Sequence, residues 1–330
     1  MTVYSNKTIP YADTYVIYIA EGSILVIFNA FFASLIYCIR HLRRQKEYVI
    51  IAWNLIFDSF YGLAHFTAGT YRLSLYYSET YYPLYSKWQC LFTVHGSLFV
   101  LMNPGVGWIN LFTCCNQLIS VIWPLHYIRW RLRYVYVVPA VSIVFTISTY
   151  IWAIVANFPT KNELEVTANC NIRETNTELV YGVLRLIRII TTFIAIALYL
   201  PIVVQIFKIL QTDPTTTFNS QNRRKLIRMT FTVLLITINQ LCLFSIRDLW
   251  LMLHPKNDSV ILSILALNKG MFNILIFLIT QTELGGKIFY QIGKWMGFHY
   301  VTNDTWLEFR TTQVQPQQQS KQNLPTPIVI

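Results

Sequence analysis

The chain has 330 residues, of which 54% are hydrophobic and only 12% are charged. A soluble globular protein carries about 25% charged residues, so this composition excludes the soluble class, and six cysteines are too few for a disulfide-stapled scaffold. The formal net charge of +11 would suggest a nucleic-acid partner in a soluble protein, but a membrane protein concentrates Lys and Arg on its cytoplasmic side.

Seven stretches of the chain are apolar and reach the roughly 20 residues that a helix needs to cross a bilayer. They lie at about 15–39, 48–71, 88–122, 134–157, 183–210, 226–252 and 259–282. The strands of a membrane barrel are about 10 residues long and alternate apolar with polar residues, whereas these stretches are longer and more uniformly apolar. The sequence therefore predicts an all-α bundle of seven transmembrane helices.

Basic residues divide unevenly between the connections. Sixteen of the 26 Lys and Arg residues lie in the connections after the first, third and fifth spans and in the C-terminal tail, against six in the remaining loops and the N-terminal tail. The positive-inside rule then predicts an extracellular N-terminus and a cytoplasmic C-terminus. In this orientation the net charge faces the anionic cytoplasmic leaflet, so no nucleic-acid partner is needed to explain it.

The polarity of the segments outside the spans divides the chain into four parts. We predict an extracellular tail at 1–14, the seven-helix domain at 15–283, an amphipathic membrane-surface helix at 284–299 and a disordered cytoplasmic tail at 300–330. Two asparagines on the extracellular side, Asn6 and Asn257, begin Asn-x-Thr and Asn-x-Ser sequons. We expect both to be glycosylated.

Three polar side chains lie near the middle of predicted spans: Asn29 in the first, Asp58 in the second and Asn273 in the seventh. Polar groups inside a bilayer are costly, and these three fall at similar depth when the spans alternate in direction. We therefore predict a hydrogen-bonded network that joins the three helices. The alternative is that each side chain bonds to its own backbone.

Two cysteines lie on the predicted extracellular side. Cys90 begins the third span, and Cys170 lies in the connection 158–182. The other four cysteines lie inside predicted spans, and the extracellular compartment is oxidising. The sequence therefore predicts a Cys90–Cys170 disulfide that ties this connection to the top of the third span.

Several short motifs combine with this topology. Residues 116–127 (NQLISVIWPLHY) resemble the end of helix three and the following loop in the rhodopsin-like G-protein-coupled receptors. Residues 273–277 (NILIF) resemble the Asn-Pro-x-x-Tyr motif of helix seven in that family, and Pro201 resembles its helix-five proline. With the seven spans and the disulfide, the chain resembles a rhodopsin-like receptor over about residues 15–295.

Two further runs, 46–52 and 68–72, look like those of the nematode serpentine chemoreceptors of the Srx and Srsx type. The sequence departs from the wider family at Asn116 and Gln117, where helix three usually has Asp and Arg, and the sixth span lacks the usual proline. In the family, that Arg holds the inactive state and then meets the G protein. An uncharged Gln117 therefore implies a changed activation switch.

The resemblance implies a ligand site in the extracellular half of the bundle. By depth, its candidate residues are His95, Phe99, Arg185, Arg188, Trp250 and Lys269. Because Arg185 and Arg188 are three residues apart, they share a helix face. With the basic groups of the sixth and seventh spans, they would form a positively charged cavity for a small anionic or polar ligand. In the alternative, the two arginines reach the lipid headgroups, and Arg247 pairs with Asp248 or with other loop charges.

On the cytoplasmic side, the resemblance implies a contact with a heterotrimeric G protein. Its candidate residues are Asn116, Gln117, Pro124, Arg129, Arg223, Arg224 and Lys225. The alternative partner of the basic residues in this group is the anionic lipid leaflet.

The leading functional prediction is a chemosensory receptor, in the plasma membrane or a sensory cilium, that binds a small molecule or peptide and signals to a G protein. The alternatives are a seven-helix binding protein without G-protein coupling, a transporter, which would need matching broken spans in two halves, and an odorant-gated channel with its N-terminus inside. We predict no enzyme, because no nucleotide-binding glycine loop, Ser/His/Asp arrangement or HExxH motif occurs.

We also predict no cofactor and no metal. Lys269 invites comparison with the retinal lysine of opsins, but it precedes Asn273 by four residues rather than six, which places it on a different helix face. His95 has no second ligand at a zinc spacing.

Overall fold

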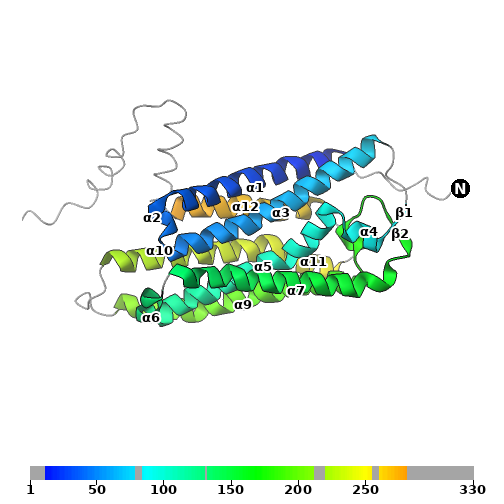
Figure 1. The fold of residues 1–330 in the computed structure, drawn as a ribbon. Coiled ribbons are helices and arrows are strands. Elements are labelled where there is room, and N and C mark those ends of the chain that lie inside the picture. Colours follow the sequence, from blue (N-terminus) through cyan, green and yellow to red (C-terminus); the bar gives the residue numbers. More distant parts are fainter. Residues whose placement is uncertain (1–11, 79–83, 131, 212–219, 255–259, 281–330) are drawn as a thin grey trace, which may run out of the picture. The chain divides into compact units, whose positions relative to one another are not determined.

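The computed structural model describes residues 12–78, 84–130, 132–211, 220–254 and 260–280. Almost all of this part of the chain is helical (Figure 1), which confirms the all-α class. The long helices are α1 (Ala12–Cys38), α3 (Lys46–Tyr77), α5 (Val94–Ile122), α7 (Val137–Asn157), α9 (Glu178–Gln211), α10 (Ser220–Gln240) and α12 (Val260–Thr280). The shorter elements are α2 (Arg40–Arg43), β1 (Leu84–Ser86), α4 (Lys87–Leu91), α6 (Pro124–Arg129), η1 (Leu132–Tyr136), η2 (Phe158–Thr160), β2 (Leu164–Thr167), α8 (Ile172–Thr175), η3 (Leu241–Ser245) and α11 (Ile246–Leu253).

Within the described residues, six helical segments are long and apolar enough to cross a membrane. They are Ala12–Cys38, Lys46–Tyr77, Val94–Ile122, Leu132–Thr160, Glu178–Lys208 and Ile227–Leu253. The predicted seventh span corresponds to α12, whose apolar part, Ile264–Thr280, is shorter than the other six. Several helices of this length and composition are typical of a multi-pass membrane protein.

The surface and the interior of the described helices have the polarity that lipid requires. Large apolar side chains point outward, including Val144, Val155 and Leu200, which are 61%, 66% and 71% exposed. Polar side chains such as Asn29 and Gln240 are completely buried. This arrangement would be unfavourable in water, but it matches a bundle whose outer face is solvated by lipid tails.

The predicted third span is not one helix. The side chain of Ser86 accepts a hydrogen bond from the Gln89 backbone N–H, and the side-chain oxygen of Gln89 accepts one from the Ser86 backbone N–H, so a capping box starts the short α4. Thr93 then caps α5 by accepting from the Gly96 backbone N–H at 3.2 Å. The expected span from 88 therefore breaks after Leu91, and the membrane helix begins at Val94.

The predicted sixth span is continuous but irregular. It consists of α10, the single π turn η3 and α11, and the sequence contains no proline there. The π turn replaces the regular i to i+4 pattern over Leu241–Ser245, and such turns are frequent at functional sites. Within it, Phe244 is almost completely buried against α3 and α5.

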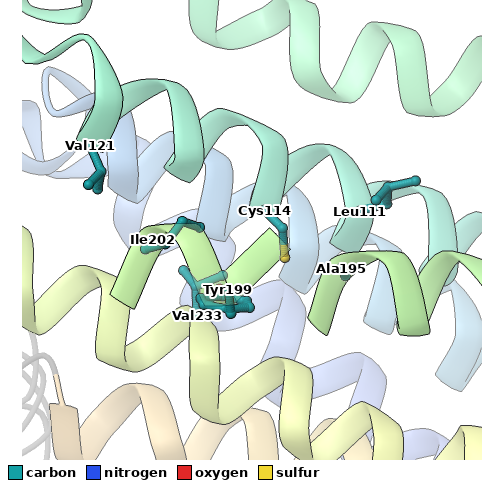
Figure 2. Close-up of a cluster of buried hydrophobic side chains, with 7 residues drawn as sticks. All are labelled: Leu111, Cys114, Val121, Ala195, Tyr199, Ile202 and Val233. Atoms are coloured by element: carbon teal, nitrogen blue, oxygen red, sulfur yellow. The ribbon is translucent and has the colours of Figure 1, made fainter. Parts of the chain in front are cut away.

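The helices pack around α5, which contacts α3, α7 and α9. Figure 2 shows one of the buried clusters, in which side chains of α5 and α9 meet with one from α10. Its members are Leu111, Cys114, Val121, Ala195, Tyr199, Ile202 and Val233. Elsewhere α1 lies against α3, and an added Cβ on Gly22 would come within 2.8 Å of the Gly62 carbonyl oxygen. Glycine at Gly22 therefore lets the two backbones approach closely.

A small antiparallel pair of strands, β1 and β2, lies at the end of the bundle that carries the disulfide (Figure 1). Leu84 pairs with Thr167 and Tyr85 with Val166, with an irregularity before Ser86. The sequence analysis did not predict these strands, because each has only three or four residues. The sequence of β2, Leu-Glu-Val-Thr, alternates apolar with polar residues, which is a local signal for a strand.

Candidate ligand site

A cavity of about 220 Å³ opens at the disulfide end of the helices. Side chains from α1, α3, α5, α9 and α11 line it, together with residues on either side of Cys170. Polar and aromatic groups from distant parts of the sequence therefore converge on one concave site, which is the usual arrangement of a small-molecule pocket.

The segment around Cys170 is held over this cavity by two attachments. Cys170 forms the predicted disulfide with Cys90, and its backbone has a φ of 46°. From α3, Arg72 donates from Nε to the Asn169 carbonyl oxygen at 3.2 Å and from Nη2 to the Cys170 carbonyl oxygen at 3.4 Å. The disulfide and Arg72 together position Asn169 and Asn171, which both line the cavity.

A buried ion pair borders the cavity between α9 and α11. The Arg188 Nε donates to Asp248 Oδ2 at 2.5 Å, its Nη2 contacts the same oxygen, and its Nη1 donates to Asn103 Oδ1 at 2.8 Å. The guanidinium carbon also lies 4.8 Å from the ring centre of Phe244. Arg188 therefore points into the bundle, and the alternative that it reaches lipid headgroups is wrong.

Aromatic rings form another part of the wall. The ring of His65 lies 4.6 Å from that of Tyr61, 4.7 Å from that of Phe99 and 5.8 Å from that of Tyr18, all edge to face. Edge-to-face contacts of this kind are favourable and fix the orientation of each ring. They give the cavity an aromatic part of its wall beside its charged groups.

Only some of the predicted pocket residues line this cavity. Phe99, Arg185 and Arg188 do, and Arg185 also lies over the Tyr181 ring at 4.1 Å. The prediction is not met by three others, which are not among the lining residues: His95 is buried beside Tyr71, Trp250 stacks on His254 at the surface, and Lys269 is bonded to Asp58. The depth of a residue along a span does not show toward which side of the helix its side chain points. For these three residues, that direction takes the side chain away from the cavity.

The sequence analysis missed Arg72 and His65. Both belong to α3, and Asp58, His65 and Arg72 follow one another at intervals of seven residues. Since seven residues are close to two helical turns, the three side chains lie along one stripe of the helix. That spacing is a signal in the sequence for a buried polar stripe on α3.

The predicted polar network exists in part, deeper in the bundle. Asp58 accepts from the Lys269 ammonium at 2.6 Å on one oxygen and from the Asn273 amide at 2.9 Å on the other. Asn239 of α10 donates to Asn273 Oδ1 at 2.8 Å and to the Lys269 carbonyl oxygen at 2.9 Å. The network therefore joins α3, α10 and α12 rather than α1.

The prediction is wrong for Asn29. Its amide donates to the Leu25 carbonyl oxygen of its own helix at 2.8 Å. Among the described residues this is the bond that the amide donates, so Asn29 does not join Asp58 although the two lie at similar depth.

At the other end of α5, two predicted contact residues bond to neighbouring elements. Gln117 donates to the Thr230 hydroxyl of α10 at 2.5 Å, and Asn116 donates to the Tyr127 hydroxyl of α6 at 3.4 Å. Burial raises the pKa of Tyr127 above its usual range, so the phenol stays neutral and can accept this bond. Both residues are buried, and they hold the end of α5 to α6 and α10.

The remaining predicted residues at that end are only partly described. Pro124 begins α6, and Arg129 ends it with an exposed side chain. The side chains of Arg223, Arg224 and Lys225 lie outside the description. The glycosylation candidates Asn6 and Asn257, the predicted surface helix 284–299 and the tail 300–330 also fall outside the described residues.

No known protein-family model matches this chain, and no curated protein matches it.

Proposed function

We propose that this protein is a seven-helix chemosensory receptor in the plasma membrane, with its N-terminus outside and its C-terminus inside. A small ligand binds in the cavity at the disulfide end, and a heterotrimeric G protein binds at the opposite end. α12 is the seventh span in this proposal. The uneven distribution of Lys and Arg and the oxidised Cys90–Cys170 pair support the orientation.

One observation carries the proposal. The sixth helix, formed by α10, η3 and α11, contributes a side chain to the ion pair at the cavity, to the Asp58 network and to the contact with Gln117. Asp248 borders the cavity, Asn239 joins the Asp58 network, and Thr230 accepts from Gln117 at the far end. A ligand that changes the position of α11 therefore acts on the same rigid element that holds the end of α5. Ligand binding shifts the equilibrium between two settings of that helix.

In this mechanism, the hydrogen bond between Gln117 and Thr230 is the latch: it holds α10 to the end of α5 in the inactive setting. It is a neutral hydrogen bond, worth about 1 kcal/mol, so a modest difference in ligand affinity between the two settings is enough to release it. The receptor-like family to which the chain bears a resemblance uses a charged Arg in this place, and here the bond replaces that ion pair.

The test measures G-protein subunit dissociation in cells, with surface expression quantified for every variant. Thr230→Val removes the acceptor of the latch, and we expect basal G-protein activation to rise by roughly two- to fivefold, as about 1 kcal/mol permits. Ser142→Ala is the matched control, because among the described residues that buried hydroxyl bonds only to Val138 of its own helix. Unchanged basal activity in Thr230→Val for every G-protein class would count against the proposal.

A second candidate, a ligand-binding protein that does not couple to a G protein, is favoured by the uncharged Gln117. The double variant Asn116→Asp/Gln117→Arg separates the two. If the wild type responds to members of a panel of odorants, small acids and peptides, the receptor proposal stands without the Arg. If only the double variant responds, the second candidate is the better description of the natural chain.

A further inference from the structure

Among the described residues that line the cavity, basic side chains outnumber acidic ones. Four arginines, Arg72, Arg185, Arg188 and Arg247, and one carboxylate, Asp248, are in this group. The carboxylate is already engaged, because Asp248 Oδ2 receives both contacts from Arg188. That pair is close to neutral as a unit, so Asp248 does not offset the charge of Arg72.

Arg72 gives the strongest case. Only 8% of this residue is exposed, and among the described residues its hydrogen bonds go to the neutral carbonyl oxygens of Asn169 and Cys170. A buried charge without an opposite charge is expensive. An anion in the cavity would supply that charge and bind the fork-shaped guanidinium in two places.

The cavity also presents acceptors. Asp248 Oδ1 is buried and has no hydrogen-bond partner among the described residues, and the same holds for Asn169 Oδ1. Both residues line the cavity, and Asp248 is completely buried. A buried acceptor without a partner is costly, so a ligand that donates a hydrogen bond here removes that cost.

The size and the aromatic wall limit the rest of the ligand. At roughly 30 Å³ per water molecule, a cavity of about 220 Å³ corresponds to about seven waters. The rings of Tyr18, Tyr61 and Phe99 meet around His65 on one side. A short, flat apolar group fits against such a wall better than a long chain or a peptide.

We infer that the cavity binds a small organic anion that also carries a hydrogen-bond donor, with Arg72 as the partner of the anionic group and Asp248 as the acceptor. This inference rests on the proposed function, in which the cavity is the ligand site. The anionic group is a carboxylate or a similar oxyanion, and its source is either a soluble acid or the headgroup of an anionic lipid.

The experiment uses the purified full-length protein in phosphatidylcholine nanodiscs and measures binding directly, without any signalling partner. The ligands are small hydroxy-acids, beginning with 4-hydroxyphenylacetate, each compared with its neutral amide and with the acid that lacks the hydroxyl. For the wild type we expect the best acid to bind at least tenfold more tightly than its amide and several-fold more tightly than the acid without the hydroxyl.

Three variants identify the residue responsible. In Arg72→Gln we expect the preference for acid over amide to fall below threefold, and in Arg72→Lys to be kept in part, which separates loss of charge from loss of fold. Arg173→Gln is the matched control, because Arg173 is an exposed arginine of the same end that does not line the cavity. Thermal melting of each nanodisc preparation checks that the variants are folded.

Nanodiscs that contain phosphatidylserine distinguish the two sources. A lipid headgroup in the cavity would raise the melting temperature of the wild type but not of Arg72→Gln before any acid is added, whereas a soluble ligand would leave both unchanged. The inference is overturned if no acid binds more tightly than its amide, or if the preference persists in Arg72→Gln. Tight binding of the amides alone would overturn it while leaving the proposed receptor function intact, and binding of neither would count against the ligand site itself.

Discussion

Two buried ion pairs of the described helices have the same chemistry in opposite settings. Arg188 and Asp248 border a cavity of about 220 Å³, whereas Asp58, the partner of Lys269, lines one of only about 20 Å³. In the deeper pair, both carboxylate oxygens of Asp58 accept hydrogen bonds, one from Lys269 and one from Asn273. In the pair at the cavity, Asp248 leaves Oδ1 without a partner among the described residues.

The difference indicates two roles. A pair whose acceptors are all used can only hold helices together, and the Asp58 pair does this for α3, α10 and α12. A pair with an unused acceptor beside a cavity can exchange partners with whatever enters. The pair whose carboxylate acceptors are all hydrogen-bonded is therefore the structural one, and the pair with an unused acceptor is the one that responds to a ligand.

The largest effect should follow from breaking the deeper pair. Asp58→Asn leaves the Lys269 ammonium buried against a neutral amide, and we expect the free energy of unfolding to fall by about 3–5 kcal/mol. Chemical unfolding of the protein in detergent measures it. As a control, Glu165→Gln breaks the exposed pair between Lys87 and Glu165, and we expect a change below about 1 kcal/mol. Equal losses in the two variants would contradict the distinction between buried and exposed pairs.

A smaller loss is expected at the cavity. Asp248→Asn removes the opposite charge from Arg188, but water in the adjoining cavity can solvate the guanidinium, so we expect about 1–3 kcal/mol. The same unfolding measurement gives the comparison. A loss as large as that of Asp58→Asn would show that the two pairs have one and the same structural role.

The latch between α5 and α10 should contribute less again. Gln117→Ala removes one buried hydrogen bond to Thr230, and we expect the free energy of unfolding to fall by about 1 kcal/mol. The unfolding midpoint measures this loss. No loss would mean that the contact with Thr230 does not contribute to the stability of the folded state.

The smallest effect should come from removing both charges of the deeper pair. Asp58→Leu combined with Lys269→Met leaves no unpaired charge, and buried pairs replaced in this way often cost nothing, so we expect stability within about 1 kcal/mol of the wild type. Comparison with Asp58→Asn in the same unfolding assay gives the coupling between the two residues. If the double variant is as unstable as the single one, Lys269 is not the reason that Asp58 matters.

Hydropathy alone predicted the positions of the helices because a span of about 20 apolar residues has few other outcomes in a chain this poor in charge. The break between α4 and α5 was missed, although Thr93, the residue that caps the start of α5, is visible in the sequence. Apolar residues continue through the break, so the prediction from hydropathy extended the span across it.

The candidate site was predicted less completely, for a geometric reason. Depth along a span correctly suggested that Asp58 and Asn273 meet, but it also suggested Asn29, which faces its own backbone. It assigned Lys269 to the ligand site, whereas the ammonium lies against Asp58. The rotation of each helix and the path of the segment around Cys170 depend on packing between distant residues, which one sequence does not state.

The single π turn at Leu241–Ser245 has a consequence for how the two ends of the sixth helix are related. Each residue of a regular α-helix advances the side chains by about 100°, so an extra residue in one turn offsets everything beyond it by that angle. With this offset in place, Asp248 contacts Arg188 and Thr230 contacts Gln117. If the π turn became regular α-helix, one of the two side chains would rotate away from its partner. The rotation of α10 about the helix axis is therefore tied to that of α11. A shift of the π turn along the chain would change the side-chain directions at both ends of the sixth helix.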